Sequence, residues 1–327
     1  MDGLPLSLLP IDARQVDGRQ VVARQADGRL VDSWARQHTL KAAIGCVGTG
    51  LHSGRRARLM LRPAPAGHGI VFRRTDLGRD IPARFDHVAD LRLATTLALP
   101  GDSAARVGTV EHLLAALAGL GIDNALVEVD GPELPILDGS AAPFVFLIDC
   151  AGIAAQDAPR RVLRVRRPVR VSDGEGYVEL RPGAGPGLDM RLSIDFAAPA
   201  IGRQAISLLL SPESFRADLA AARTFALAGE IDQLRAAGLA QGGSLDNAVV
   251  VDGEKVLNPG GLRMDGEFVR HKLLDAVGDL ALAGVALEGR FIAHRSGHAL
   301  NNRLLHALFA DRAAWRETAA EAVSAAA

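Results

Sequence analysis

Apolar and polar residues alternate over residues 56–61, which predicts a strand, and a second apolar stretch at 69–72 follows a turn rich in proline and glycine. The short connection predicts that these two strands form a hairpin. Residues 109–118 carry apolar positions at helical spacing, with Thr109 as the expected N-cap and glycines at the end. The other elements expected in this half are a strand at 124–129 and a helix at 142–151.

The second half of the chain repeats this mixture of strands and helices, and its strongest helix is expected at 266–282. The other expected elements are strands at 162–171, 177–180, 190–196, 247–251 and 291–294, a mostly helical region at 213–227, and a final helix from residue 299 to the C-terminus. Runs of strands with interspersed helices, found twice, predict an α+β protein with two domains of similar size. We expect the first domain at 38–158 and the second at 159–327, with the boundary at the Pro159-Arg160-Arg161 sequence.

Residues 1–37 differ from the rest of the chain. The sequence ARQVDGR at 13–19 is nearly repeated as ARQADGR at 23–29. Copies this short are too small for a solenoid unit. We interpret the segment as a flexible leader, with an overlong gene start as the alternative.

Charge and composition exclude several classes of protein. The 327 residues include 37 basic and 38 acidic side chains, a net charge of -1, without the basic excess of a nucleic-acid-binding protein. There is no uninterrupted apolar run of about 18 residues to predict a transmembrane segment, and the first residues make a poor secretory signal. The two cysteines, Cys46 and Cys150, cannot form a disulfide framework. We therefore expect a cytoplasmic protein.

One candidate for chemistry lies on the helix expected at 266–282. His271, Asp275 and Asp279 follow one another at intervals of four residues and so share one face of this helix. An imidazole and a carboxylate in this relation can bind one metal ion. The apolar stripe lies opposite, so a solvated polar face with ion pairs is the simpler interpretation of this pattern alone.

A third metal ligand is available on the helix at 109–118, where Glu111 and His112 are adjacent. Two imidazoles and one carboxylate leave the fourth tetrahedral position of a catalytic zinc site open. Glu111 would then act as the general base on the attacking water. The alternative is that Glu111 only complements the helix dipole and that His112 is structural.

His298 follows a strand and a glycine turn and opens the last helix, a position that exposes a side chain at the end of a sheet. It is a candidate general acid or a cationic stabiliser of a developing oxyanion. A helix-capping or surface role is the alternative.

Together and in this order, these clusters resemble the zinc-dependent UDP-3-O-acyl-N-acetylglucosamine deacetylase family of lipid A biosynthesis. The resemblance covers about residues 38–312. It rests on GLHSG at 50–54, LRPAP at 61–65, VFRRTD at 71–76, TVEH at 109–112, LDGS at 137–140, ARTF at 222–225, the helix around His271, and SGHALNN at 296–302. It implies two domains of similar topology, each a sheet layered with helices, with the active site between them.

The resemblance also implies roles for individual residues. His112, His271 and Asp275 match the zinc ligands. Glu111 matches the general base and His298 the general acid or cationic stabiliser, with Asp279 orienting it. On the substrate side it implies that Thr224 supports the oxyanion, Lys272 lies towards the phosphates, Leu51 and Phe225 contact the sugar and acyl chain, Ile231 begins the acyl passage at 231–239, and Arg295 contacts the substrate.

Two features depart from the family pattern. The leader before residue 38 has no counterpart in it. Ala94-Thr95-Thr96 stands where some members carry a cysteine near the metal, so we expect no thiol there.

The implied function is hydrolysis of the N-acetyl group of UDP-3-O-(3-hydroxyacyl)-N-acetylglucosamine, which releases acetate and the free amine in the committed step of lipid A biosynthesis. The expected cofactor is Zn²⁺, with iron as an alternative at such a site. We expect no partner beyond the UDP-linked substrate: no nucleic acid, no transmembrane segment, and a monomer. Two rivals stay open, a zinc amidase acting on another N-acyl substrate and a non-catalytic protein that binds a nucleotide sugar.

Overall fold

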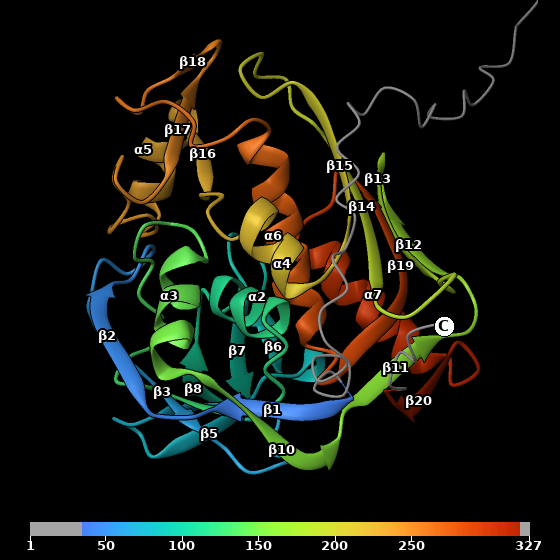
Figure 1. Ribbon diagram of the computed structural model, residues 1–327. Coiled ribbons are helices and arrows are strands. Elements are labelled where there is room, and N and C mark those ends of the chain that lie inside the picture. Colours follow the sequence, from blue (N-terminus) through green and yellow to red (C-terminus); the bar gives the residue numbers. More distant parts are fainter. Residues whose placement is uncertain (1–34, 321–327) are drawn as a thin grey trace, which may run out of the picture.

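The computed structural model describes residues 35–320, and within this range the fold is α+β. A five-stranded sheet and a seven-stranded sheet are the largest, and helices lie between them (Figure 1). The expected leader at 1–37 lies outside the described residues except at its end. There, Arg36 and Gln37 already belong to strand β1 (Arg36–Leu40), which pairs antiparallel with β10 (Ile153–Pro159).

The five-stranded sheet has the order β2-β3-β9-β4-β5. Its strands are β2 (Ile44–Thr49), β3 (Arg56–Pro63), β4 (Ile70–Arg74), β5 (Arg79–Pro82) and β9 (Ala125–Val129). The predicted hairpin between residues 56–61 and 69–72 is therefore wrong, because β9 lies between β3 and β4, antiparallel to the first and parallel to the second. Ala125, Val127 and Val129 of β9 point to one face of the sheet and are fully buried there, whereas Leu126 and Glu128 on the other face are half-buried. Local alternation predicts a strand but not its partner.

The candidate residues of the first half, Glu111 and His112, begin a helix that follows a small antiparallel sheet. The small sheet, preceded by the 3₁₀ turn η1 (Phe85–His87), contains β6 (Val88–Asp90), β7 (Thr96–Leu99) and β8 (Asp102–Val107). Helix α2 (Glu111–Gly119) packs on α3 (Ala142–Ala151), which confirms both predicted helices. Thr109 does not cap α2, however: its φ is 56°, its hydroxyl donates to Glu133, and the helix begins after Val110 without a side-chain cap.

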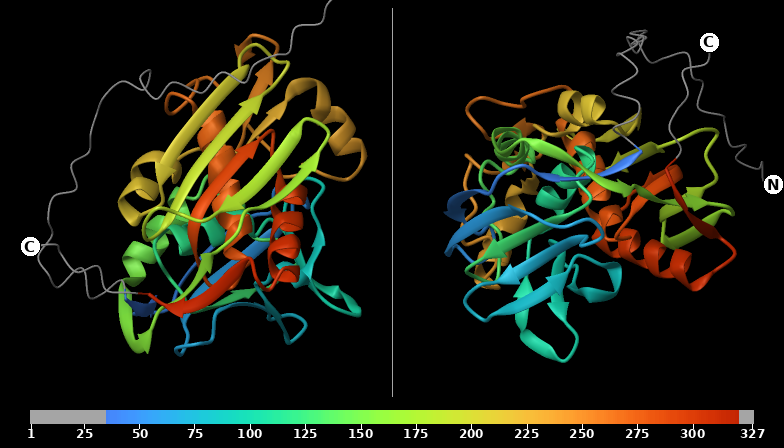
Figure 2. Two further views of the ribbon diagram at one scale, coloured as in Figure 1. Left: turned by 90° about the vertical axis from the view of Figure 1, so that its right-hand side faces the viewer. Right: turned by 60° about the horizontal axis from the view of Figure 1, so that its bottom comes forward.

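The seven-stranded sheet is centred on β19 (Ala286–His294), which pairs with β11, β13 and β14. Its other strands are β11 (Arg161–Val165), β12 (Val169–Asp173), β13 (Gly176–Arg181), β14 (Leu188–Asp195), β15 (Arg203–Leu209) and β20 (Trp315–Ala319). The single strand expected at 162–171 is two strands, because Pro168 between them has no N–H to donate to a ladder. Figure 2 shows this sheet from its outer side, with helices behind it.

The end of the described chain also differs from the prediction. The expected final helix, α7 (His298–Ala310), stops well before the C-terminus, and β20 follows it and pairs antiparallel with β11. β20 is stabilised by its hydrogen bonds to β11, at the other end of the second half of the chain. The sequence pattern of the last residues alone cannot predict this pairing.

The region expected to be helical at 213–227 is only partly so. A short helix α4 (Pro212–Ser214) continues into the π-helical turn η2 (Phe215–Leu219), and the chain then forms strand β16 (Phe225–Leu227). β16 pairs in parallel with β17 (Val249–Asp252), which pairs with β18 (Lys255–Val256), and α5 (Ala228–Ala236) lies between β16 and β17 in the chain. Just before β16, the N–H and guanidinium of Arg223 bind the buried Glu267. These distant contacts override the local helical pattern.

Helix α6 (Glu267–Ala281) is the centre of the fold. It packs against α2, α7 and the strands β14, β15 and β19. At Gly278 the two helices α2 and α6 approach so closely that a Cβ would lie 2.1 Å from the Glu111 carbonyl oxygen. This contact brings the start of α2 against the last turn of α6.

Candidate metal centre and active site

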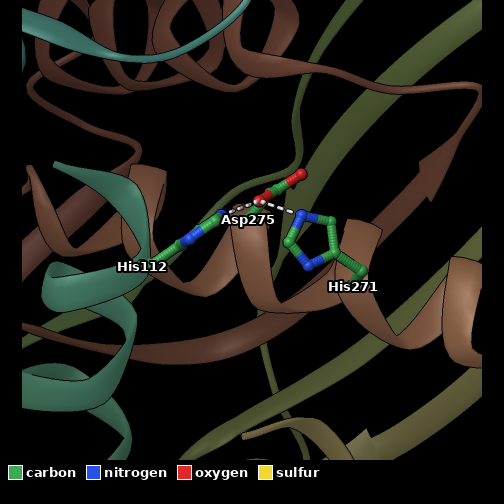
Figure 3. A group of neighbouring side chains, drawn as sticks. All are labelled: His112, His271 and Asp275. Atoms are coloured by element: carbon green, nitrogen blue, oxygen red, sulfur yellow. Dashed lines mark ion pairs between the residues drawn. The ribbon is translucent and has the colours of Figure 1, made fainter. Parts of the chain in front are cut away.

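His112 of α2 and His271 and Asp275 of α6 point towards one another (Figure 3). Asp275 Oδ1 lies 3.3 Å from His271 Nε2 and 3.7 Å from His112 Nε2. One candidate ligand atom from each residue lies within 4.8 Å of the others, so this group could hold a metal ion.

The hydrogen bonds around these three residues also support metal binding. His271 Nδ1 lies 3.0 Å from the Ala222 carbonyl oxygen, which can only accept, so Nδ1 carries the proton and Nε2 presents a lone pair. That lone pair faces Asp275 Oδ1, a buried atom without a hydrogen-bond partner among the described residues. Two electron-rich atoms at this distance without a proton between them fit a cation.

Burial corrects the simpler interpretation of α6 as a solvated polar face. His271, Asp275 and Asp279 are 3%, 5% and 2% exposed, and the opposite, apolar face of the helix is buried as well. Burial lowers the pKa of His271, and it lowers the pKa of His112 to about 3, so both imidazoles are neutral and able to act as ligands. Burial opposes ionisation of Asp275, but the positive charges of Lys272 and His298 hold its pKa below the ordinary value.

Glu111, the first residue of α2, lies beside this group and is buried. Its Oε2 accepts a hydrogen bond of 3.0 Å from the Thr95 N–H. Burial raises the pKa of Glu111 to about 7, and the carboxylates of Asp275 and Asp279 add to the shift while His298 opposes it. A carboxyl group with a pKa in this range can accept a proton near neutral pH.

His298, at the start of α7, faces Glu111 from the other side. Its Nε2 lies 4.0 Å from Glu111 Oε1, and its Nδ1 lies 2.8 Å from Asp279 Oδ2. Burial alone would lower the pKa of His298, but the charge and hydrogen bond of Asp279 raise it to about 9. The imidazole is therefore cationic at neutral pH and can donate a proton or stabilise an anion.

The expected substrate-side residues lie at different distances from this centre. The ring of Phe225 lies 6.3 Å from the ring of His271, and Lys272 Nζ lies 3.3 Å from Asp275 Oδ2. Both residues are therefore beside the His-His-Asp group. The N–H of Thr224 donates to the Gly139 carbonyl at 2.8 Å, which ties the Thr224–Phe225 segment to the first half of the chain.

The other three are not brought to the His-His-Asp group by any described contact. Leu51 lies in the loop after β2, and its carbonyl accepts a hydrogen bond of 3.0 Å from the Gly242 N–H. Ile231 is a half-buried residue of α5. The guanidinium of Arg295 pairs with Glu175 and Asp195, so carboxylates already engage it.

Thr95 and Asn301 are members of the site that the sequence analysis did not assign. The Thr95 hydroxyl donates to Asp279 Oδ1 at 2.7 Å, and Asn301 Nδ2 donates to Asp279 Oδ2 at 2.8 Å. Thr95 therefore holds both Glu111 and Asp279. Asn301 follows His298 at helical spacing, a signal that could have been used. Thr95 lies directly before β7, outside any helix or strand, so no periodicity marks it.

A cavity of about 930 Å³ lies elsewhere, at the C-terminal ends of α2 and α6. Leu117, Ile122 and Leu280 contribute to its walls, and the described residues that line it include none of the candidate site residues. It is separate from the His-His-Asp group, which lies near the start of α2.

A buried His-His-Asp group flanked by a carboxylate and a cationic imidazole is typical of metal-dependent hydrolases. The chain belongs to the UDP-3-O-acyl N-acetylglycosamine deacetylase family, which matches residues 37–310.

Relatives that carry the name UDP-3-O-acyl-N-acetylglucosamine deacetylase are similar along most of their length. The protein of Acidithiobacillus ferrooxidans is 52% identical over 284 residues, which are 86% of this chain and 92% of the relative. That of Idiomarina loihiensis is 50% identical over the same shares of the two chains. That of an Anaeromyxobacter species is 51% identical over 84% of this chain and 89% of its own. Within residues 35–320, no helix has the length and apolarity needed to cross a bilayer.

Proposed function

We propose that this protein hydrolyses the N-acetyl group of UDP-3-O-(3-hydroxyacyl)-N-acetylglucosamine, releasing acetate and the free glucosamine amine, the committed step of lipid A biosynthesis. The observation that carries the proposal is that Glu111 and His298 lie together beside the His-His-Asp group. Glu111 Oε1 is 4.0 Å from His298 Nε2. Together they supply a base, an acid and a metal site, which are what metal-assisted amide hydrolysis needs. The names and the length of the match to the relatives support the choice of substrate.

His112, His271 and Asp275 are the proposed ligands, and Zn²⁺ is the proposed metal because two imidazoles and one carboxylate suit it. When bound, Zn²⁺ would supply Lewis-acid chemistry that polarises the amide carbonyl and acidifies the attacking water. The buried, unpartnered Asp275 Oδ1 supports this assignment.

The protein's own groups move the protons. Glu111 accepts a proton from the attacking water, and the Thr95 N–H holds its carboxylate in place for this step. His298, cationic through Asp279, stabilises the oxyanion and donates a proton to the leaving amine. Thr224, one residue from Phe225 in the tied segment, is the proposed hydroxyl donor to the same oxyanion.

The remaining residues are proposed to bind the substrate: Lys272 towards the phosphates, Leu51 and Phe225 at the sugar and acyl chain, Ile231 in the acyl passage, and Arg295 at the periphery. We further propose that the two halves, 38–158 and 159–327, are two domains with the site between them. His112 comes from the part of the chain before residue 158, whereas His271 and His298 come from the part after it, which supports this arrangement. One chain contributes every proposed group, which fits a monomer, and the free thiols of Cys46 and Cys150 fit a cytoplasmic enzyme.

Acetate release from the UDP-linked substrate by the purified, zinc-loaded protein tests the proposal. We expect turnover that a chelator abolishes and that added Zn²⁺ restores. A panel of other N-acetylated sugars is the control for substrate class. Turnover of another N-acyl compound in preference to the UDP-linked substrate would replace the proposed substrate, and absence of any hydrolysis by the metal-loaded protein would contradict the enzyme assignment.

A further inference from the structure

Glu133 lies in the connection between β9 and α3 and is only 6% exposed. Three donors surround its carboxylate. Oε1 accepts hydrogen bonds from the His52 N–H at 2.8 Å and from the Thr109 hydroxyl at 3.1 Å, and Oε2 accepts one from the Ser53 N–H at 2.8 Å. Since hydrogen bonds to a carboxylate are stronger than those between neutral groups, this side chain is a firm link between the segments that donate to it.

The first of these segments is the entry to α2. Thr109 has a φ of 56°, a left-handed conformation that a β-branched residue adopts only when its surroundings impose it. It stands two residues before Glu111 and three before His112. The hydrogen bond to Glu133 therefore holds the strained residue from which the catalytic turn of α2 starts.

The second segment is the loop at 50–54, which contains Leu51. At Gly50 a Cβ would lie 2.3 Å from Glu133 Oε2, so glycine at this position lets the carboxylate approach the loop. The loop is also tied on its far side, where the His52 carbonyl accepts a hydrogen bond from the Gln241 N–H at 3.2 Å. Glu133 thus lies between the catalytic turn and a loop that reaches the segment after α5.

We propose that Glu133 is a positioning residue that holds the start of α2 and the loop at 50–54 in a fixed relation, so that the base Glu111 and the substrate contact Leu51 act on one bound molecule. The proposal rests on the proposed function for the roles of Glu111 and Leu51, but the link itself does not depend on it. Glu133→Gln removes the carboxylate charge, so every hydrogen bond that the side chain still accepts becomes weaker. The new amide –NH₂ also faces either the Ser53 N–H or the two donors at Oε1, so both segments would lose part of their support.

Glu133→Gln tests both ends of the link. We expect kcat to fall and KM to rise, with a combined loss in kcat/KM of about 10- to 100-fold, because small misplacements of reacting groups have effects of this size. Glu179→Gln is the matched control: Glu179 is a buried carboxylate, 4% exposed, that accepts hydrogen bonds from Arg181 in β13. It should change the melting temperature and leave kcat and KM as they are.

Thr109 separates the catalytic end from the substrate end. Thr109→Val removes the hydroxyl and keeps the branched shape, and we expect it to lower kcat about 10-fold with KM almost unchanged, whereas Thr109→Ser keeps the donor and should retain most of kcat. Combined with Glu133→Gln, Thr109→Val should lose less activity than the sum of the two single losses, because both substitutions act on the same contact. If Thr109→Val lost no more activity than Thr109→Ser, the proposed link to α2 would be wrong.

Hydrogen exchange keeps this test independent of the reaction. In Glu133→Gln, the amides of residues 50–54 and 109–113 should exchange faster than in the wild type, and those around Glu179 should not. Unchanged exchange in both segments would overturn the proposal whatever the activity. A wild-type protein that releases no acetate would instead contradict the proposed function, and the exchange result would still decide the role of Glu133.

Discussion

Asp279 Oδ2 lies 2.8 Å from His298 Nδ1, and the same carboxylate accepts hydrogen bonds from Thr95 and Asn301. Because Nδ1 of the cationic ring donates to Asp279, Nε2 is the nitrogen that faces Glu111 Oε1. Asp279 therefore decides both the orientation and the charge of the imidazole.

This pair predicts the shape of the pH profile of kcat/KM. With Glu111 as the proposed base and His298 as the proposed acid, activity should need ionised Glu111 and protonated His298, so the profile should be bell-shaped. The acidic limb should lie at or below the pKa of about 7 that burial gives Glu111, because a bound cation favours the carboxylate. The basic limb should lie near the pKa of about 9 that Asp279 gives His298. Rates measured across both limbs at constant ionic strength check this.

Asp279→Asn should move the basic limb towards lower pH, because burial, which lowers the pKa of His298, would then act without the opposing carboxylate. His298→Gln should lower kcat by about 10²- to 10⁴-fold and remove that limb. A basic limb that stayed in place in both variants would assign it to another group.

The pair of Asp279 and His298 also affects the stability of the fold. Its contribution to the free energy of unfolding is present below the ordinary histidine pKa of 6.5 and is lost as the pH rises through about 9.

His271→Ala should lose most of the bound metal, because it removes the imidazole whose Nε2 lies 3.3 Å from Asp275 Oδ1. Glu111→Gln should keep the metal and lose turnover, because Glu111 is proposed as the base and not as a ligand. Metal analysis of the two purified variants, with acetate release measured in parallel, checks this. Equal metal content in the two variants would contradict the ligand assignment.

Gly278→Ala should push α2 and α6 apart, because its Cβ would lie 2.1 Å from the Glu111 carbonyl oxygen. We expect a loss of about 1–3 kcal/mol in the free energy of unfolding, as for other overpacked cores, together with lower kcat. Gly229→Ala in α5 is the control, since nothing lies within 4 Å of a Cβ there. That variant should be as stable as the wild type or slightly more so. Denaturant unfolding of both variants gives the comparison, and equal stability would contradict close contact at Gly278.

Glu267→Ala should destabilise the protein by about 3–5 kcal/mol, because it leaves the guanidinium of Arg223 buried without its carboxylate. The exposed pair of Arg216 and Asp149 is the control, and Asp149→Ala should cost less than about 1 kcal/mol. Chemical denaturation of the two variants measures both values. A similar loss in the two would indicate that burial of the Arg223 pair adds nothing.

Three failures of the sequence analysis share a cause. The hairpin of 56–61 with 69–72 failed because β9, from much later in the chain, enters between β3 and β4. The helix expected at 213–227 failed where Arg223 meets Glu267, and the final helix failed where β20 meets β11. In each case a contact between distant residues outweighed a local preference.

By itself, the sequence determined the candidate groups for chemistry and the helical face that carries them, because spacing by four residues on a helix fixes the relation of His271 to Asp275. Taken alone, the same spacing favoured a solvated polar face, which the burial of His271 and Asp275 excludes. Only the tertiary structure decided that this face is buried against α2, that Thr95 holds Asp279 from 184 residues away, and that Glu133 joins two separate segments. Periodicity reports the geometry of one element, whereas burial and partners arise where elements meet.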